Sequence, residues 1–272
     1  METILARISQ EIKSNKKVAM AIVTNVEGAT PATVGATMGI FEDASIIGSV
    51  GGGETEAKVI EKAIKCMEEG KCGSFVFDTF EKAQDASIMS KCGAKTHVFI
   101  RVYNQKPKLL LVGGGHVAHE LYKFGKTLDF SVTIFEDRED FCTKERFPEA
   151  DELICGNVSE NLQNYNINDN CYVIMVSRGH KQDQDALKAV ITSDAKYIGM
   201  IGSKHKVKEI FDNLRSEGIS ERLLSKVYSP IGLAIGGRKI QEIALGIMAE
   251  VVLVKNGGCS THMKYISSQI DF

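Results

Sequence analysis

The chain of 272 residues has no tryptophan, only four prolines and no marked excess of charge of either sign. No apolar run reaches the roughly 18 residues that a membrane-spanning helix needs. The first 17 residues lack the apolar centre of a signal peptide. A formal net charge of -2 offers no basic field for nucleic acid. We therefore expect a cytoplasmic protein that binds neither membrane nor nucleic acid.

The spacing of the cysteines is not that of a disulfide-bonded or zinc-binding domain. The seven cysteines are odd in number and none are spaced as CxxC, so neither a set of disulfides nor a zinc ribbon is indicated. We predict no metal site. Cys155 ends an apolar segment that favours a small buried thiol. Cys92, in the segment 90–94, is the cysteine that we expect to be exposed, although reactivity would also need thiolate character.

The length corresponds to roughly two domains of about 150 residues. We place the boundary in the segment 104–107, because Pro107 can neither continue a helix nor sit inside a β-ladder. This gives domains over residues 1–104 and 105–272. The first is predicted to be a smaller α/β domain with a mixed sheet. Its helices are expected at 2–14 and 54–69, and its strands at 18–26, 37–41, 45–50, 73–78 and 95–102.

Strand and helix patterns alternate through the second half of the chain. Strands are expected at 109–112, 132–136, 152–155, 171–176 and 197–201, and helices at 116–126, 181–191, 204–217 and 240–254. Such alternation favours parallel strands joined by crossover helices. We therefore predict a Rossmann-like, doubly wound parallel sheet.

The turn after the strand 109–112 has the composition of a phosphate-binding loop. Gly113, Gly114 and Gly115 precede a helix that begins at His116, and with Ala118 they complete the pattern GxGxxA. Glycines let a ligand approach the backbone, and the first amides of a helix have no partner within the helix. This turn predicts a site for an anionic cofactor.

An acidic residue ends the next strand, a little over 20 residues further on. Glu136 or Asp137 is placed to accept hydrogen bonds from a ribose, which favours a nicotinamide dinucleotide. Arg138 can instead pair with a 2'-phosphate, so NAD and NADP both remain open. The alternative is that this domain takes another ligand or none.

A second glycine cluster lies in the first domain. Gly51, Gly52 and Gly53 come directly before the helix expected from Glu54, and they expose backbone amides to an anion such as a phosphate or an oxo-metal group. A tight turn between a strand and a helix explains the same glycines equally well.

Two further clusters follow strands of the predicted parallel sheet, at the edge where such sheets bind ligands. Arg178 can hold an anion in its fork, and His180 can exchange protons near neutral pH, although a lone histidine is more often structural. Gly202 and Ser203 form a small-residue turn into the helix expected from residue 204.

Seven segments together resemble the xanthine dehydrogenase accessory factor family, XdhC/CoxI. They are GSVGGGETE (48–56), KCGA (91–94), LLLVGGGHVAHEL (109–121), FEDRED (135–140), SRGHKQDQDAL (177–187), YIGMIGSKHK (197–206) and SPIGLAIGG (229–237). Each segment alone is a weak signal, but seven in order across both domains are specific.

The resemblance implies a maturation chaperone that binds molybdenum cofactor, holds it while a terminal sulfur ligand is installed, and delivers it to a xanthine dehydrogenase-type hydroxylase. It also implies a cysteine desulfurase as partner and a homodimer. The chain departs from the family where Glu54 replaces a cysteine, where Ala32 replaces an arginine and where Ala234 replaces an acid. Cys92 then remains as the thiol expected to contact metal or sulfur.

We therefore expect the two glycine turns to enclose a cleft for an anionic pterin, closed by Arg178 and His180. The competing hypothesis is an NAD(P)-dependent oxidoreductase in which His180 acts as acid or base. A regulatory protein that senses a nucleotide without turnover is the third possibility.

Overall fold

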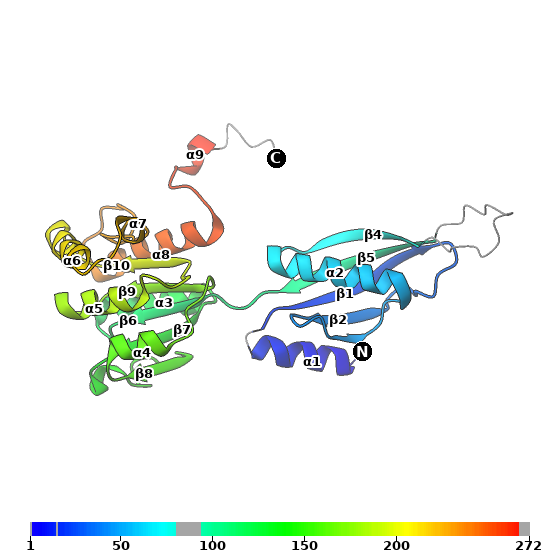
Figure 1. The fold of residues 1–272 in the computed structure, drawn as a ribbon, viewed down its shortest axis with the longest axis horizontal. Helices are drawn as coiled ribbons and strands as arrows, with labels where there is room; N and C mark the ends of the chain where they lie inside the picture. The colour runs from blue at the N-terminus through cyan, green and yellow to red at the C-terminus, as the bar shows by residue number, and fades with distance from the viewer. Residues whose placement is uncertain (1, 15, 80–93, 267–272) are drawn as a thin grey trace. The chain divides into compact units, whose positions relative to one another are not determined.

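The computed structural model describes residues 2–14, 16–79 and 94–266, which form two compact units, Met1–Gln105 and Lys106–Phe272. Each unit has its own sheet and its own buried core (Figure 1). No helix within the described residues combines the length and the apolarity needed to cross a bilayer.

The first unit is built on a five-stranded sheet with the order β3-β2-β1-β5-β4. Its strands are β1 (Val18–Glu27), β2 (Thr37–Phe41), β3 (Ile46–Gly48), β4 (Gly73–Thr79) and β5 (Ala94–Tyr103). Every described pair is antiparallel, whereas the sequence predicts a mixed sheet. The reason is that the helical crossover which the structure describes joins β3 to β4, and these strands lie at opposite edges of the sheet and do not pair with each other.

Helices cover both faces of this sheet. The helix α2 (Gly53–Glu69) packs Val59, Ala63 and Met67 against one face, and α1 (Glu2–Lys13) packs Ile8 against the other. The glycine turn at 51–53 thus joins the edge strand β3 to a helix that is anchored in the core.

The second unit has a parallel five-stranded sheet with the order β10-β9-β6-β7-β8, which confirms the predicted Rossmann-like architecture. Its strands are β6 (Lys108–Val112), β7 (Ser131–Glu136), β8 (Glu152–Cys155), β9 (Cys171–Met175) and β10 (Tyr197–Met200). β6 lies at the centre of the sheet. The chain first adds β7 and β8 on one side of β6 and then adds β9 and β10 on the other side. The strand order therefore reverses between β6 and β9, which is where open α/β sheets bind ligands.

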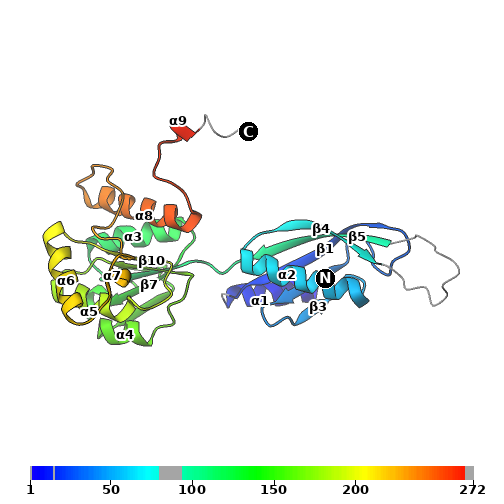
Figure 2. The same cartoon turned by 45° about the horizontal axis from the view of Figure 1, so that its top comes forward.

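Helices pack on the two faces of this sheet (Figure 2). One face carries α3 (His116–Thr127) and α8 (Ile240–Asn256), which contact each other along their lengths. The other carries α4 (Val158–Asn164), α5 (His180–Val190) and α6 (Lys204–Ser216), with the short helix α7 (Glu221–Leu224) beside them. A 3-10 helix, η1 (Glu139–Phe141), follows β7, and α9 (Met263–Ile266) ends the described chain.

The segment between α7 and α8 is fixed to the sheet by polar and aromatic contacts. The hydroxyl of Tyr197 in β10 donates to a carboxylate oxygen of Glu250 in α8, and the same oxygen accepts the N–H of Gly232 at 3.0 Å. The ring of Tyr197 also stacks on that of Tyr228. Burial and the neighbouring carboxylate raise the pKa of Tyr197, so its proton stays in place for this bond.

Candidate functional site

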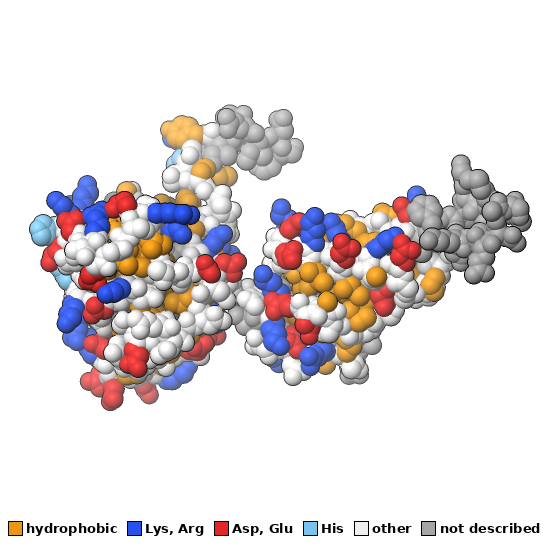
Figure 3. Space-filling model, in the orientation of Figure 1, with side chains coloured by type: hydrophobic (Ala, Val, Ile, Leu, Met, Phe, Trp, Pro, Cys, Tyr) orange, Lys and Arg blue, Asp and Glu red, His pale blue; other side chains and the backbone are white. Residues whose placement is uncertain are grey.

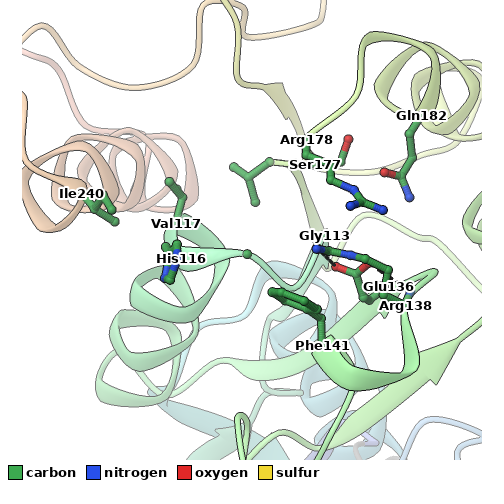
Figure 4. Close-up of a pocket in the computed structure, with 12 residues that line it drawn as sticks. Gly113, His116, Val117, Glu136, Arg138, Phe141, Ser177, Arg178, Gln182 and Ile240 are labelled. Atoms are coloured by element: carbon green, nitrogen blue, oxygen red, sulfur yellow. Dashed lines mark hydrogen bonds and ion pairs between the residues drawn. The ribbon is translucent and has the colours of Figure 1, made fainter.

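A cavity of about 440 Å³ opens at the carboxyl edge of the parallel sheet, at the point where the strand order reverses. Its walls come from the turn after β6, the start of α3, the segment after β7 and the segment after β9 (Figure 4). This volume lies within the range of about 300 to 1,000 Å³ that is typical of small-molecule sites.

The glycine turn after β6 offers fewer amides to this cavity than its sequence indicates. The N–H of Gly113 donates to the carbonyl of Phe135 at 2.8 Å, and the N–H of Gly114 donates to a carboxylate oxygen of Glu136 at 2.5 Å. The amides of Gly115, His116 and Val117 have no hydrogen-bond partner among the described residues. These three amides at the start of α3 are the ones available to an anion.

Glu136 is buried beneath the turn and its carboxylate is fully engaged. One oxygen accepts from the backbone N–H groups of Asp137 and Arg138, both at 3.1 Å, and from Arg138 Nε at 2.9 Å. The other accepts from Gly114 and from a terminal nitrogen of Arg138 at 2.9 Å. Burial opposes the charged form, but these donors outweigh it and lower the pKa of Glu136 to about 2.

This arrangement changes the expected role of the acid. A ribose hydroxyl would have to displace Arg138 or Gly114 before it could donate to Glu136. Asp137 is exposed and lies outside the cavity lining. The ribose contact at either acid stays a prediction, and the structure shows Arg138 paired with Glu136.

The opposite wall carries an arginine and a serine (Figure 4). Arg178 lines the cavity and its guanidinium has no ion-pair partner among the described residues. Ser177 donates its hydroxyl to Asp183 in α5, which is fully buried and paired with Lys206 Nζ of α6 at 2.5 Å. An ionised carboxylate can only accept hydrogen bonds, so Ser177 uses its hydroxyl proton in the bond to Asp183. The oxygen of Ser177 can therefore act toward other groups only as a hydrogen-bond acceptor.

Sequence analysis missed this buried pair, although its signal is present. Asp183 lies six residues after Ser177, and its side chain turns back from the first turn of α5 to the end of β9. An acid in the first turn of a helix suggests only a dipole effect. Lys206 lies three residues after Ser203, the N-cap of α6. Only the packing of α5 on α6 shows that Lys206 is the partner of Asp183.

Three predicted site residues lie away from this cavity. His180 is the first residue of α5 and is exposed, with its Nδ1 3.8 Å from Glu209 of α6. Gly202 and Ser203 follow β10, and the hydroxyl of Ser203 caps α6 by accepting from Lys206 N at 3.3 Å. None of the three lines the cavity.

The other glycine turn forms a smaller cavity of about 170 Å³ lined by residues 30–32 and 50–55. A carboxylate of this chain already occupies part of the turn. Glu56 accepts from Ser49 Oγ at 2.5 Å and from the N–H groups of Val50 and Gly52 at 3.2 and 3.3 Å. These bonds outweigh burial and lower the pKa of Glu56. Gly51 donates to Ser49 Oγ at 3.1 Å, so an anion at Gly51–Gly53 stays a prediction.

Cys92 lies outside the described residues. Cys155 is exposed rather than buried, because it is the last residue of the edge strand β8 and its side chain is not covered by a further strand. No group of three or more His, Cys, Asp or Glu side chains within the described residues is arranged to hold a metal ion.

The parallel sheet and the glycine turn after β6 define a protein with a Rossmann-type domain. Comparison with family models then identifies the family: the XdhC Rossmann domain matches residues 109–251, and the XdhC and CoxI family matches residues 12–78. The chain belongs to the XdhC and CoxI family, which confirms the resemblance in its sequence.

The proteins similar to this chain include two curated relatives and a solved structure. The uncharacterized protein YqeB of Escherichia coli K12 is 30% identical over 90% of this chain and 44% of the relative. A protein of Bacillus subtilis 168 named as a probable xanthine dehydrogenase subunit is 28% identical over 58% of this chain and 46% of the relative. The chain thus spans less than half the length of either. A crystal structure described as a xanthine dehydrogenase from Bacillus halodurans shares the fold, with a TM-score of 0.53 and 20% identity over 94% of this chain and 98% of that one.

Proposed function

We propose that this protein is a xanthine dehydrogenase accessory factor that binds molybdenum cofactor in the Rossmann cavity, holds it for sulfuration and delivers it to a molybdenum hydroxylase. Membership of the XdhC and CoxI family and a relative whose name places it with xanthine dehydrogenase support the accessory role. That the bound ligand is molybdenum cofactor, and that the protein delivers it to a hydroxylase, goes beyond this accessory role and is our proposal.

The observation that carries the choice of ligand is the state of Glu136. Its charge is neutralised by Arg138, and its oxygens are taken by donors of the protein. The acid that would recognise a ribose is thereby withdrawn, while Arg178 and the amides at 115–117 still face the cavity. The remaining chemistry favours an anion over a sugar hydroxyl.

The residues fit an anionic pterin in the following way. The first amides of α3 would hold its phosphate, and Arg178 on the facing wall would pair with the same or a second negative group (Figure 4). Ser177, whose proton is directed to Asp183, would accept a hydrogen bond from an N–H of the ring. When bound, the group supplies a molybdenum centre carried by an anionic dithiolene.

The proposed partners follow from this role. The hydroxylase of the xanthine dehydrogenase type would receive the cofactor, and a cysteine desulfurase would supply the sulfur. Cys92 is the proposed sulfur contact, and a homodimer is the proposed assembly. We further propose that the protein acts in the cytoplasm. Lys, Arg, Asp and Glu side chains are interspersed on the face seen in Figure 3, so charge alone does not single out a docking surface there.

The proposal is tested by binding. Purified protein is mixed with molybdenum cofactor released from a molybdenum enzyme, and retained pterin is measured by fluorescence after gel filtration. The Arg178→Ala variant should bind about 10 to 100 times more weakly, because a charge-assisted hydrogen bond contributes about 1.5 to 3 kcal/mol. Arg222→Ala, which removes an exposed arginine in α7, is the matched control and should bind normally. If folded wild-type protein retains no pterin, the proposal is wrong.

An NAD(P)-dependent oxidoreductase is the second candidate, favoured by the strand order 3-2-1-4-5 of the parallel sheet, counted from its own first strand, and by the glycine turn. It requires Arg138 to leave Glu136 on binding or to accept a 2'-phosphate. Titration with NADH and NADPH by fluorescence distinguishes the two. Micromolar binding together with turnover of a small carbonyl compound would support the oxidoreductase.

A further inference from the structure

A buried chain of hydrogen bonds runs from the interior of the second unit to the cavity wall. Lys206 Nζ of α6 pairs with one carboxylate oxygen of Asp183 at 2.5 Å, and Ser177 Oγ donates to the other at 2.5 Å. The Asp183 side chain is fully buried and that of Lys206 is 11% exposed. Ser177 lines the cavity and the other two residues do not, so they act on a ligand only through Ser177.

The direction of these hydrogen bonds is set by charge. A lysine ammonium has only donors and an ionised carboxylate has only acceptors, so the hydroxyl of Ser177 supplies the proton in its contact with Asp183. The carbonyl of Gly179 is a second acceptor within reach, but it is neutral and lies 3.4 Å from Ser177 Oγ. Hydrogen bonds to a charged acceptor are shorter and stronger than those to a neutral one, so the proton stays on Asp183.

Ser177 therefore meets the cavity as an acceptor. Its oxygen has two lone pairs, and the N–H of Gly179 uses one of them at 3.4 Å, which leaves one for a ligand. The position of Ser177 is fixed by the glycine turn, because its Cα would lie 3.0 Å from a Cβ at Gly113. Arg178, the next residue, offers only donors to the same cavity (Figure 4). Adjacent residues of this wall thus differ in hydrogen-bonding polarity.

We propose that Asp183 and Lys206 are positioning residues that hold the Ser177 hydroxyl as a hydrogen-bond acceptor, and that the cavity thereby selects a ligand with an N–H donor in addition to its anionic group. A ligand that presents a lone pair to Ser177 places acceptor against acceptor and binds more weakly. The inference rests on the proposed function for its ligand, an anionic pterin with N–H groups, and adds which residues select that ligand.

Asp183→Asn reverses the polarity of Ser177. Because Lys206 can only donate, the new amide turns its oxygen to Lys206 and its NH2 group to Ser177, which then loses the lone pair that faced the ligand. Molybdenum cofactor, measured by pterin fluorescence after gel filtration, should bind about 10 to 100 times more weakly, because an N–H of the ligand is left without an acceptor. Asp185→Asn, the same change in α5 at a carboxylate outside the cavity lining, should bind normally.

A double-mutant cycle separates positioning from a loss of structure. Ser177→Ala should weaken binding about 3 to 10 times, because it removes one hydrogen bond to the ligand. Adding Asp183→Asn to Ser177→Ala should weaken binding no further, since the hydroxyl through which Asp183 acts is gone. If Asp183→Asn has the same effect with and without the Ser177 hydroxyl, its role is structural and the proposal is wrong.

A measurement without ligand covers the case in which Asp183→Asn does not fold. The proton NMR spectrum of the wild-type protein should contain a slowly exchanging hydroxyl signal that is missing in Ser177→Ala, because the proton is held in a short bond to a buried carboxylate. Absence of this signal would overturn the proposal.

The binding assay also separates this inference from the proposed function. If the wild type retains pterin and Asp183→Asn binds it equally well, only the selection by this wall is refuted. If the wild type retains no pterin, the proposed function is wrong, and the same variants are titrated with NADH, whose carboxamide carries N–H donors. Equal affinity of wild type and Asp183→Asn for NADH, or no binding of either probe, overturns the inference as well.

Discussion

Replacing Glu136 by glutamine tests the electrostatics at the base of the Rossmann turn. The carboxylate receives five hydrogen bonds, from Gly114, Asp137 and Arg138, and its pKa is lowered to about 2 from an ordinary value of 4.5. At about 1.36 kcal/mol per pKa unit, this difference corresponds to about 3 kcal/mol of stability at neutral pH. A glutamine places N–H donors against donors and loses that contribution.

The pH dependence has a definite sign. Because the pKa of Glu136 is lower in the folded protein than in the unfolded chain, its contribution is fully present above about pH 5 and is lost as the pH falls toward 2. Wild type should exceed Glu136→Gln in free energy of unfolding by about 3 kcal/mol at pH 7 and by only about 1.4 kcal/mol at pH 3.

Urea unfolding followed by tyrosine fluorescence is the assay. There is no tryptophan, and all tyrosines except Tyr103 lie in the second unit, so the signal reports mainly on that unit. Glu139→Gln, which removes an exposed carboxyl from the same segment, should change the free energy of unfolding by less than about 0.5 kcal/mol. A difference between wild type and Glu136→Gln that is equal at pH 7 and pH 3 would refute the reasoning.

Three further predictions concern the stability of the second unit, each measured by the same urea titration at pH 7. Gly114→Ala should lower the free energy of unfolding by about 1 to 3 kcal/mol, because the added Cβ would lie 2.6 Å from a backbone carbonyl oxygen. The control Gly115→Ala places its Cβ more than 4 Å from any other group and should leave the free energy of unfolding nearly unchanged. Equal losses in the two variants would contradict this prediction. Lys206→Met should cost about 3 to 5 kcal/mol by leaving Asp183 buried and unpaired, and a loss below 1 kcal/mol would show that the pair is not buried as described. Tyr197→Phe should cost about 1 to 3 kcal/mol, because the carboxylate of Glu250 in α8 loses one of its two hydrogen bonds and keeps only that from Gly232; no loss would argue against the Tyr197 bond.

The elements of the second unit were largely predictable because each has a strong local signal. The strand at 109–112 is a continuous apolar run, as expected for a strand buried on both faces, and it is observed as Lys108–Val112. The helix expected from residue 181 begins at His180, because Gly179 is its N-cap. The short helices α4 and α7 were not predicted, since four to seven residues carry too little periodicity to be recognised.

The candidate site was less predictable, because its chemistry depends on where hydrogen bonds go. Glycines at 113–115 indicate an amide-rich turn, but only the structure shows that Gly114 donates to Glu136. The sequence left open whether Arg138 pairs with a 2'-phosphate of a ligand, and the structure shows its guanidinium on Glu136, two residues away. Sequence shows which groups a turn contains, whereas packing decides which of them remain available.

The two glycine turns share one feature that bears on how such turns are interpreted. In each, a glutamate of the same chain accepts the amides that an anion would use: Glu136 at Gly114, and Glu56 at Val50 and Gly52. Buried amides must have partners, and an internal carboxylate satisfies them without a ligand. A glycine-rich turn therefore predicts an anion site only for the amides left over after these internal bonds. In the Rossmann turn those are the amides of residues 115–117, which line the same cavity as Arg178 and carry our proposal for the anionic cofactor.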